Sequence, residues 1–344
     1  MIPLIKRLGF AGIRAIPLKW LKAASPIRVI SPFHHLVSDE PVPYIEKLYA
    51  FKNSRQFEAD LDYLLRHFRP LSLEEVIQQE KTGQPFEQPG FLICFDDGLR
   101  SVYETAAPIL LRKGVPAAFF INPAFVDNKD IFYNFKKGLI LDKFDRTAIS
   151  ESTLAEGSRL LGQKFANPGE FRTSIRSVNY LNRHLMDNLG NLFQLDFDTF
   201  RKEQRPFMTT QQIKELIGKG FGVGSHSIDH PLYALLSLEE QLRHTRESTD
   251  WVTRTFELPY KAFAFPHIDT GVGHAFFQAL VGGPSPEMDL LMGNSTGMLE
   301  AHARTLHRFI GENPAIPIEA MVKSVMAYGA VRKKIGRPFV QRTK

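Results

Sequence analysis

The sequence is poor in the features that build disulfide-stapled or membrane-spanning proteins. Cys94 is the single cysteine among 344 residues, so a disulfide within the chain is excluded. It lies in the apolar segment 91–95, which predicts a small buried side chain in a strand and argues against a catalytic thiol. No apolar run approaches the roughly 20 residues needed to span a bilayer. Hydrophobic residues make up 43% and charged residues 23%, which is typical of globular domains with a substantial core.

Acidic residues are absent from both ends of the chain. Residues 1–28 carry six Lys or Arg and residues 323–344 carry seven, with no Asp or Glu in either segment. The remaining residues hold 30 basic and 37 acidic side chains, so the body has a net charge of −7 although the whole chain is +6. This charge distribution does not suit binding to nucleic acid, because the body of the protein is acidic and only its ends are basic. The sequence also contains no helix-turn-helix, zinc-finger or RNA-recognition pattern. We therefore expect no nucleic-acid partner.

The N-terminal segment, residues 1–26, has no clear cleavage site for an export signal, and Arg14 and Lys19 interrupt its apolar residues. Its mixture of apolar and basic residues predicts a basic amphipathic helix. Such a helix either lies on the inner face of a membrane or packs against the protein itself, and the sequence leaves both open. We expect a cytoplasmic protein, with peripheral membrane contact in the first case.

Short β-like runs alternate with amphipathic helices from residue 27 onward, which is typical of a parallel α/β architecture. The number of runs favours a barrel-like ring of strands. Residues 123–205 break the alternation with helical patches, so we expect a mainly helical insertion in a domain that spans residues 27–322. We assign residues 323–344 to a basic C-terminal tail. Strands are expected over residues 28–33, 91–95, 117–121, 221–224, 261–265, 289–293 and 305–310.

Two adjacent carboxylates close one predicted strand, in the segment Phe95-Asp96-Asp97-Gly98. Parallel α/β proteins place their sites at the carboxyl ends of the strands. Neighbouring side chains leave the chain in different directions, so one carboxylate could bind a metal while the other handles a proton. Taken alone, Asp-Asp-Gly is also an ordinary turn sequence.

A pair of histidines follows another predicted strand, in the segment His226-Ser227-Ile228-Asp229-His230. Two imidazoles four residues apart can converge on one ion if the segment turns helically. Two histidine nitrogens and one aspartate oxygen form a three-ligand zinc site with an open position, which is the catalytic arrangement. The acidic strand end in the same fold strengthens this interpretation.

These two segments resemble motifs of the polysaccharide deacetylases of carbohydrate esterase family 4, also called the NodB homology domain. The first segment resembles the family's first motif, and the second fits its H-[S/T]-x-x-H motif. The resemblance implies an irregular (β/α)7-type barrel with Asp96 as the general base. It also implies a divalent metal held by Asp97, His226 and His230. We expect Zn2+, with Co2+, Ni2+ or Mn2+ as alternatives.

The family's third motif, F-A-Y-P-Y-G in one subgroup, resembles residues 263–267, Phe-Ala-Phe-Pro-His, with His267 where tyrosine is usual. In the family this position donates its backbone N–H to the oxyanion, and the resemblance implies that role for His267. The arginine usual in other subgroups is missing at this motif. We expect Arg308 to supply the charge that orients Asp96, and an arginine on the surface or barrel rim is the alternative.

The general acid has two candidates by resemblance. Most of the family takes a histidine from a C-terminal L-x-H motif, which Leu306-His307 resembles in part. A subgroup related to exopolysaccharide deacetylases takes it from the first strand, in an aromatic-histidine pattern that Phe33-His34 resembles. The helix that follows also resembles that subgroup, so we expect His34 to be the acid. His35 is then expected on the opposite face of the strand, in a structural role.

Together these resemblances imply a hydrolase that removes N-acetyl groups from an acetamido sugar in a polysaccharide, oligosaccharide or glycolipid precursor. A histidine acid favours an amide, because a nitrogen leaving group needs a proton more than an ester oxygen does. An O-acetyl esterase, a cyclic amide hydrolase and a non-catalytic carbohydrate-binding protein are the alternatives. We expect an acetylated carbohydrate partner, with aromatic residues of the insertion either stacking on its sugar rings or forming the insertion's own core. These aromatic residues are Phe125, Phe132, Tyr133 and Phe135.

Overall fold

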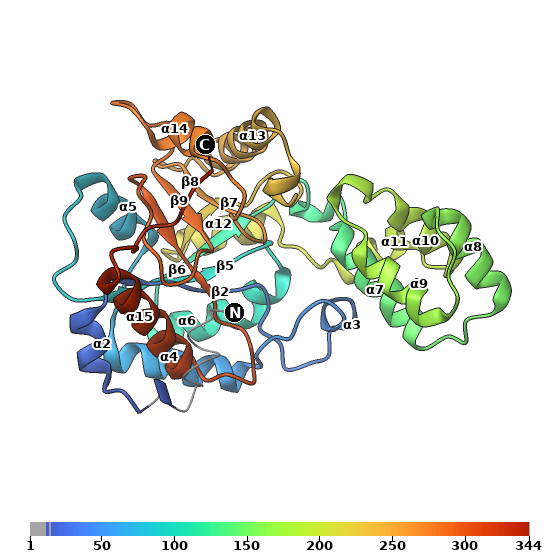
Figure 1. The fold of residues 1–344 in the computed structure, drawn as a ribbon, viewed down its shortest axis with the longest axis horizontal. Coiled ribbons are helices and arrows are strands. Elements are labelled where there is room, and N and C mark those ends of the chain that lie inside the picture. The colour runs from blue at the N-terminus through green and yellow to red at the C-terminus, as the bar shows by residue number, and fades with distance from the viewer. Residues whose placement is uncertain (1–11, 14, 344) are drawn as a thin grey trace.

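Eight short parallel strands form one sheet at the centre of the larger body of the protein (Figure 1). The computed structural model describes residues 12, 13 and 15–343. The strands run in the order β10-β9-β8-β7-β6-β5-β2-β11, and each pairs in parallel with its neighbours. They are β2 (Pro32–His34), β5 (Ile93–Phe95), β6 (Ala117–Ile121), β7 (Gly222–Ser225), β8 (Ala262–Ala264), β9 (Leu290–Gly293), β10 (Thr305–His307) and β11 (Phe309–Ile310).

The sheet closes into a ring at Arg308, the single residue between β10 and β11. β10 pairs with β9, whereas β11 pairs with β2 at the other end of the sheet. The N–H of Arg308 donates to the carbonyl of Gly293 (2.8 Å), and the N–H of Phe309 donates to that of Ser31 (3.0 Å). The chain therefore changes strand partners between two adjacent residues. Because β10 and β11 share one place in the ring, this arrangement confirms the predicted α/β barrel.

Strand residues alternate between the inside of the barrel and the layer under the helices. In β5, Cys94 is fully buried inside the barrel with Phe120, whereas Phe95 lies outside against Phe57. The same alternation returns the next residue, Asp96, to the inside. The register of β5 therefore decides which side chains reach the carboxyl end of the barrel.

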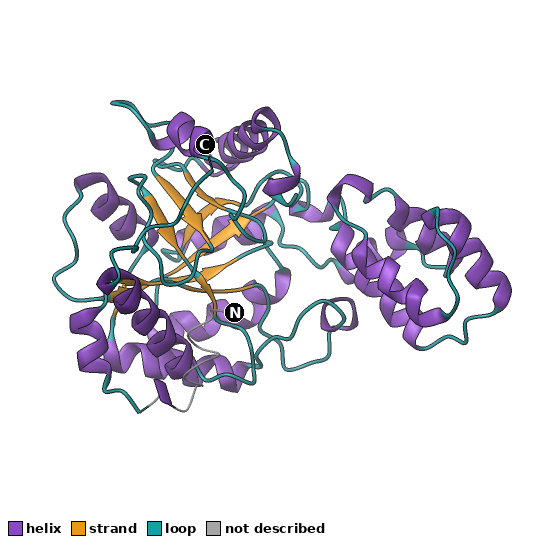
Figure 2. Cartoon of the chain, viewed as in Figure 1, coloured by secondary structure: helices purple, strands orange, loops and turns teal. Residues whose placement is uncertain are grey.

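Helices cover the outside of the barrel (Figure 2). Asn53, Ser72 and Thr209 each form a capping box, in which the side chain accepts from the N–H three residues on, and this starts the helix locally. The helices of the barrel are α2 (Leu18–Ala24), α3 (Pro43–Glu46), α4 (Ser54–His67), α5 (Leu73–Thr82), η1 (Val102–Ala106), α6 (Ala107–Lys113), α12 (Thr210–Gly218), η4 (Tyr233–Leu235), α13 (Leu238–Phe256), α14 (His274–Val281) and α15 (Ile318–Lys334). A second sheet, in the order β1-β4-β3, contains β1 (Val29–Ile30), β3 (Arg69–Pro70) and β4 (Gly90–Phe91).

A lobe of helices projects to one side of the barrel, between β6 and α12 (Figure 1). It contains η2 (Val126–Asn128), α7 (Tyr133–Asp145), α8 (Glu151–Leu161), α9 (Pro168–Ser177), η3 (Tyr180–Asn182), α10 (Leu185–Leu192) and α11 (Phe197–Gln204). Its aromatic and aliphatic side chains form a separate hydrophobic core. Helix α7 packs closely on α3, because a Cβ at Gly138 would lie 1.9 Å from the carbonyl oxygen of Tyr44. Glycine at this position therefore lets α7 pack against α3, whose Ile45 joins the same hydrophobic core.

Both ends of the chain pack against the barrel in the part that the structure describes. Most of the predicted N-terminal helix falls in residues 1–11, outside the described residues, but α2 packs against α15 and buries Leu21. The predicted tail boundary at residue 323 is wrong, because α15 continues to Lys334 and buries Val325. Its basic residues complete the last turn, where they suit the negative end of the helix dipole. Among the described helices, none has the length and apolarity needed to cross a membrane.

Candidate active site

Asp96 and Asp97 follow β5 at the carboxyl end of the barrel. Asp97 has a left-handed backbone (φ 68°), and so does Gly98 (φ 66°). A Cβ at Gly98 would lie 3.0 Å from the side chain of Ile121, so the turn has little room for a side chain there. Aspartate tolerates the left-handed region better than most residues, and glycine adopts it freely. This turn lets the two adjacent carboxylates reach different partners.

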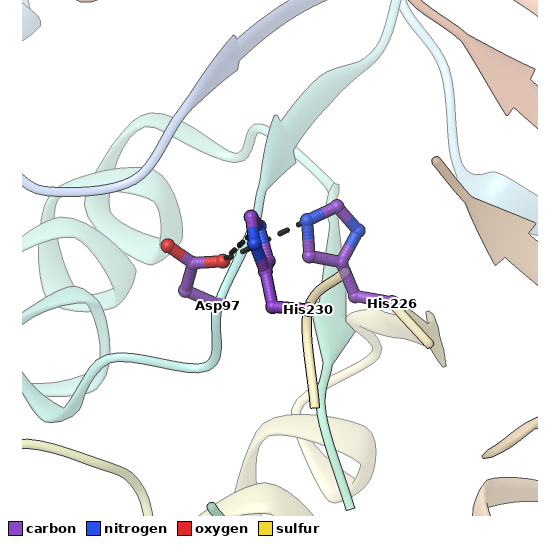
Figure 3. A group of neighbouring side chains, drawn as sticks. All are labelled: Asp97, His226 and His230. Carbon is purple, nitrogen blue, oxygen red and sulfur yellow. Dashed lines mark ion pairs between the residues drawn. The ribbon is translucent and has the colours of Figure 1, made fainter. Parts of the chain in front are cut away.

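Asp97, His226 and His230 converge at this end of the barrel (Figure 3). Asp97 Oδ1 lies 3.1 Å from His230 Nε2 and 3.6 Å from His226 Nε2. One ligand atom from each of the three buried residues lies within 4.8 Å of the others. Ligand atoms about 2.1 Å from a tetrahedral ion are roughly 3.4 Å apart, so this spacing suits a single divalent ion.

The chemistry of these atoms also fits a metal. Asp97 Oδ1, His226 Nε2 and His230 Nε2 are buried without a hydrogen-bond partner among the described residues, which is costly unless an ion satisfies them. His226 Nδ1 donates to the carbonyl of Ala264 (2.8 Å), which leaves its Nε2 lone pair free. Burial lowers the pKa of His226 to about 4, so the ring is neutral. Burial alone would raise the pKa of Asp97, but the imidazole of His230 outweighs it and lowers that pKa. Neutral His226 and ionised Asp97 are therefore in the protonation states that bind a cation.

The two histidines reach the same point through a bent loop, and the helical turn that their spacing would otherwise need is not formed. Residues 226–230 contain no helix, and Ser227 and His230 both have left-handed backbones (φ 66° each). The N–H of His230 donates to Ser227 Oγ (3.0 Å). Asn122, directly after β6, donates to the carbonyl oxygens of His226 and Ser227. These hydrogen bonds hold the loop in the shape that brings the imidazoles together.

Arg308 holds Asp96 from inside the barrel. Its Nη1 donates to Asp96 Oδ1 (2.6 Å) and its Nη2 to Oδ2 (2.9 Å), a bidentate pair. The guanidinium lies over the rings of Phe33 and Phe120, and its Nε donates to Asn294 Oδ1 (3.3 Å). Arg308 is 0% exposed, which excludes the surface or rim arginine considered from the sequence. Burial alone would raise the pKa of Asp96, but Arg308 lowers it and keeps the carboxylate ionised at neutral pH.

A comparison with models of protein families decides the relationship of this chain to known proteins. The model described as polysaccharide deacetylase matches residues 83–272, which is more than half of the chain. The chain belongs to the polysaccharide deacetylase family. The matched residues include Asp96. They also include Asp97, His226 and His230, which we call the metal-ligand group. A search of the curated proteins finds no match.

Solved structures share the fold of this family member at low sequence identity. The deacetylase PplD of Streptococcus pyogenes, solved with acetate, has a TM-score of 0.54 at 15% identity, over 88% of this chain and 99% of that chain. A de-N-acetylase from Aggregatibacter actinomycetemcomitans has a TM-score of 0.50 at 15% identity, over 86% and 99%. A polysaccharide deacetylase from Bacillus cereus has a TM-score of 0.50 at 15% identity, over 86% and 68%. At these identities, the likeness shows the fold alone.

A cavity of about 450 Å3, which we call the active-site cavity, opens beside the metal-ligand group and lies in the usual size range of small-molecule sites. Asp96, Asp97, His230 and His267 line it. His267 has a left-handed backbone (φ 56°), and its carbonyl oxygen accepts from Asn294 Nδ2 (2.6 Å). Among the described residues, no acceptor binds its backbone N–H. This N–H is therefore available to a ligand in the cavity.

The histidine that the first strand brings to the active-site cavity is His35, so the choice of His34 is wrong. The His34 ring packs against Phe57 and Phe95 under the helices (centroids 5.3 and 5.7 Å apart). Burial holds the pKa of His34 well below its usual range, so it is a poor proton donor. Phe33 lies inside the barrel, and strand alternation therefore puts His34 outside and His35 inside. The aromatic-histidine pattern does not reveal which face of the strand is the inner one.

Glu312, which follows β11, fixes both the position and the charge of His35. Its Oε1 lies 2.8 Å from His35 Nδ1, and its Oε2 accepts the backbone N–H of His35 (2.8 Å). Burial alone would lower the pKa of His35, but the Glu312 carboxylate raises it to about 10. His35 is thus protonated at neutral pH. Sequence reasoning missed Glu312 because no motif surrounds it, and only the closed ring brings β11 beside β2.

His307, the alternative acid, does not line the active-site cavity and lies in a buried polar cluster. Its Nδ1 is 3.8 Å from Asp269 Oδ2, and its Nε2 is 3.4 Å from Glu300 Oε2. Arg342 Nη2 binds the same two oxygens, at 2.5 and 2.6 Å. Asp269 also accepts the N–H of Asn294 (2.8 Å), whose side chain contacts both the carbonyl oxygen of His267 and the guanidinium of Arg308. Arg342, close to the end of the chain, therefore helps to hold Asn294 in place through Asp269.

Proposed function

We propose that this protein is a divalent-metal-dependent deacetylase that hydrolyses the N-acetyl group of an acetamido sugar in a polysaccharide, oligosaccharide or glycolipid precursor. One observation carries the proposal: a single cavity beside the metal-ligand group is lined by two of its members, Asp97 and His230, by an ionised carboxylate, Asp96, and by a protonated imidazole, His35. Hydrolysis of an amide needs a Lewis acid, a base for water and an acid for the leaving nitrogen, and these groups supply all three.

Asp97, His226 and His230 would hold the ion, which supplies Lewis acidity that acidifies water and polarises a carbonyl group. Two imidazoles and one carboxylate suit Zn2+, and they also bind Co2+, Ni2+ and Mn2+. Asp96 is the proton acceptor, because Arg308 keeps it ionised and fixes both of its oxygens. Its Oδ2 lies 3.7 Å from His226 Nε2, so the base is adjacent to the ligand group.

Two further residues that line the active-site cavity, His35 and His267, act on the leaving nitrogen and on the acyl oxygen of the substrate. The backbone N–H of His267 has no acceptor in the part of the chain that the structure describes, and it would donate to the negative charge that develops on the acyl oxygen. Protonated His35 then gives its proton to the leaving nitrogen, since an expelled amide anion is too basic to leave without one. An alkoxide leaves more easily, and this difference favours an N-acetyl over an O-acetyl substrate.

Acetate release from acetylated sugars tests the proposed function. The zinc-reconstituted protein is incubated with N-acetylglucosamine oligomers and, separately, with an O-acetylated oligosaccharide. We expect acetate from the N-acetyl substrate and a loss of at least roughly 100-fold in Asp96→Asn. Asp250→Asn, which changes a carboxylate paired with Lys261 away from the cavity, should retain activity. Acetate from the O-acetyl substrate alone would indicate an esterase, and binding without any release would indicate a non-catalytic protein; either result contradicts the proposal.

Glu312→Gln is expected to move the alkaline limit of activity to lower pH. Wild-type His35 stays protonated up to its pKa of about 10, and without the Glu312 carboxylate burial lowers that pKa. The acid form is then lost as the pH rises through a lower value, so activity falls most on the alkaline side. Profiles of kcat/KM against pH for wild type, Glu312→Gln and the control His34→Gln check this. The bound ion acts equally in all three, and an unchanged alkaline limb in Glu312→Gln would exclude His35 as the acid.

A further inference from the structure

Lys137, on α7 of the lobe, is a buried lysine whose side chain lines the active-site cavity. It is only 8% exposed. No carboxylate of the described residues pairs with it, and its one close contact of note is the ring of Tyr133, 5.3 Å from its Nζ. Lysine is almost never buried without a charged or hydrogen-bonding partner. The position of this ammonium group in a ligand cavity therefore points to a partner that arrives with the substrate.

Arg176, on α9, adds a second cation to the same wall of the cavity. It is exposed, and no acidic side chain in the described part of the chain forms an ion pair with it. Lys47, the third lysine or arginine that lines the cavity, differs because Asp145 binds its Nζ (2.9 Å). Of these three side chains, Lys137 and Arg176 are thus left without a counter-charge among the described residues.

The acidic residues of the cavity do not neutralise these two cations, because each already has a partner or a role. Asp96 binds Arg308, Glu312 binds His35, and Asp97 belongs to the metal-ligand group. Burial, and then the charge of the second cation, lower the pKa of the lysine on α7 to about 8. An anion beside the two cations would relieve this repulsion and stabilise both charges.

We propose that Lys137 and Arg176 form a subsite for an anionic group, a carboxylate or a phosphate, that the substrate carries next to its acetamido sugar. This inference rests on the deacetylase function proposed for the same cavity. Arginine binds either oxyanion through a planar pair of donors, and lysine adds a point charge. The substrate class is then an acetamido sugar joined to a uronic acid or to a phosphate, and not a neutral chain of acetamido sugars.

Binding of sugars that carry no acetyl group tests the subsite without any catalysis. Glucose 1-phosphate, glucuronic acid and glucose are titrated into the zinc-loaded protein, and binding is followed by NMR. We expect at least one of the anionic sugars to bind about tenfold or more tightly than glucose, and the better ligand distinguishes phosphate from carboxylate. Lys137→Gln and Arg176→Gln should each remove most of this preference.

The control for these variants is Lys136→Gln, which removes a neighbouring cation that pairs with Asp187 (2.6 Å) and does not line the active-site cavity. It should keep the wild-type preference. Equal binding of all three sugars overturns the proposal, and so does an anion preference that survives in both cavity variants, because the anion then binds the metal alone. Arg176→Gln changes an exposed side chain, so the test holds even if the buried lysine is needed for folding.

Kinetics distinguish failure of the subsite from failure of the deacetylase function. The values of kcat/KM are compared for N-acetylglucosamine 1-phosphate, a disaccharide of N-acetylglucosamine and glucuronic acid, and neutral N-acetylglucosamine oligomers. If neutral sugars are deacetylated as well as the anionic ones, the subsite proposal fails while the function stands. If anionic sugars bind through Lys137 and Arg176 but release no acetate, the function fails while the subsite stands.

Discussion

Asp97→Asn and His226→Ala are each expected to reduce the bound transition metal from about one ion per chain to a trace, with acetate release falling to background. Each variant removes one of three ligands whose atoms lie within 4.8 Å of one another, and two remaining ligands bind a divalent ion weakly. Asparagine suits the left-handed backbone of Asp97 (φ 68°), so this variant changes the ligand without straining the turn.

Elemental analysis of the untagged, zinc-reconstituted protein measures this loss, and circular dichroism confirms that each variant is folded. His34→Gln is the matched control, because it changes a buried histidine at the same end of the barrel that does not line the active-site cavity. It should keep the metal. Excess zinc should also raise the Tm of wild type and leave that of Asp97→Asn unchanged, since only wild type gains binding free energy in the folded state. Full metal content in Asp97→Asn would show that the ligand set is wrong.

Arg308→Met is expected to cost about 3 to 5 kcal/mol of folding stability and most of the activity at neutral pH. The substitution leaves the Asp96 carboxylate buried inside the barrel without its bidentate partner. Burial then raises the pKa of Asp96, so a larger fraction of the base is protonated at a given pH, and its carboxyl group is no longer fixed in orientation. Urea unfolding measures the folding stability, and the rate of acetate release measures the activity that depends on Asp96.

The pH dependence separates this explanation from a simple packing defect. In wild type the pKa of Asp96 is lowered, so the pair contributes stability above the unfolded value of about 3.9, and this is lost as the pH falls through the folded pKa. In Arg308→Met the carboxyl takes up a proton at higher pH, so the deficit should be smaller at about pH 5 than at about pH 8. The double variant Asp96→Asn with Arg308→Met, which buries no charge, should recover part of the loss. A deficit that is the same at both pH values would indicate lost packing alone.

The candidate site could be predicted from the sequence wherever its residues are adjacent along the chain. Asp96 and Asp97 follow a buried strand, and His226 and His230 follow another, so strand prediction alone placed them at one end of the barrel. Their convergence required only that the strands be parallel. The shape of the histidine loop was not predictable, because hydrogen bonds from Asn122, which follows a different strand, hold it.

Residues that act through distant partners could not be found in this way. His34 and His35 are adjacent, and the choice between them depends on which face of β2 lies inside the barrel, which the aromatic-histidine pattern does not report. That choice depends on closure of the ring, which also brings Glu312 to His35 and Arg308 to Asp96. No local pattern reports a contact between residues more than 200 positions apart.

The sequence by itself predicted the fold class, because short strands with polar ends and local capping signals are expressed within a few residues. The proposed metal ligands and base were predicted from two short motifs that resemble those of a known family. Only the tertiary structure decided which histidine after the first strand lines the active-site cavity and where the end of the chain packs. It also showed that Lys137 faces this cavity without a counter-charge among the described residues. The physical reason is that burial and charge pairing depend on everything that packs around a side chain, and in a closed barrel most of those neighbours come from distant parts of the chain.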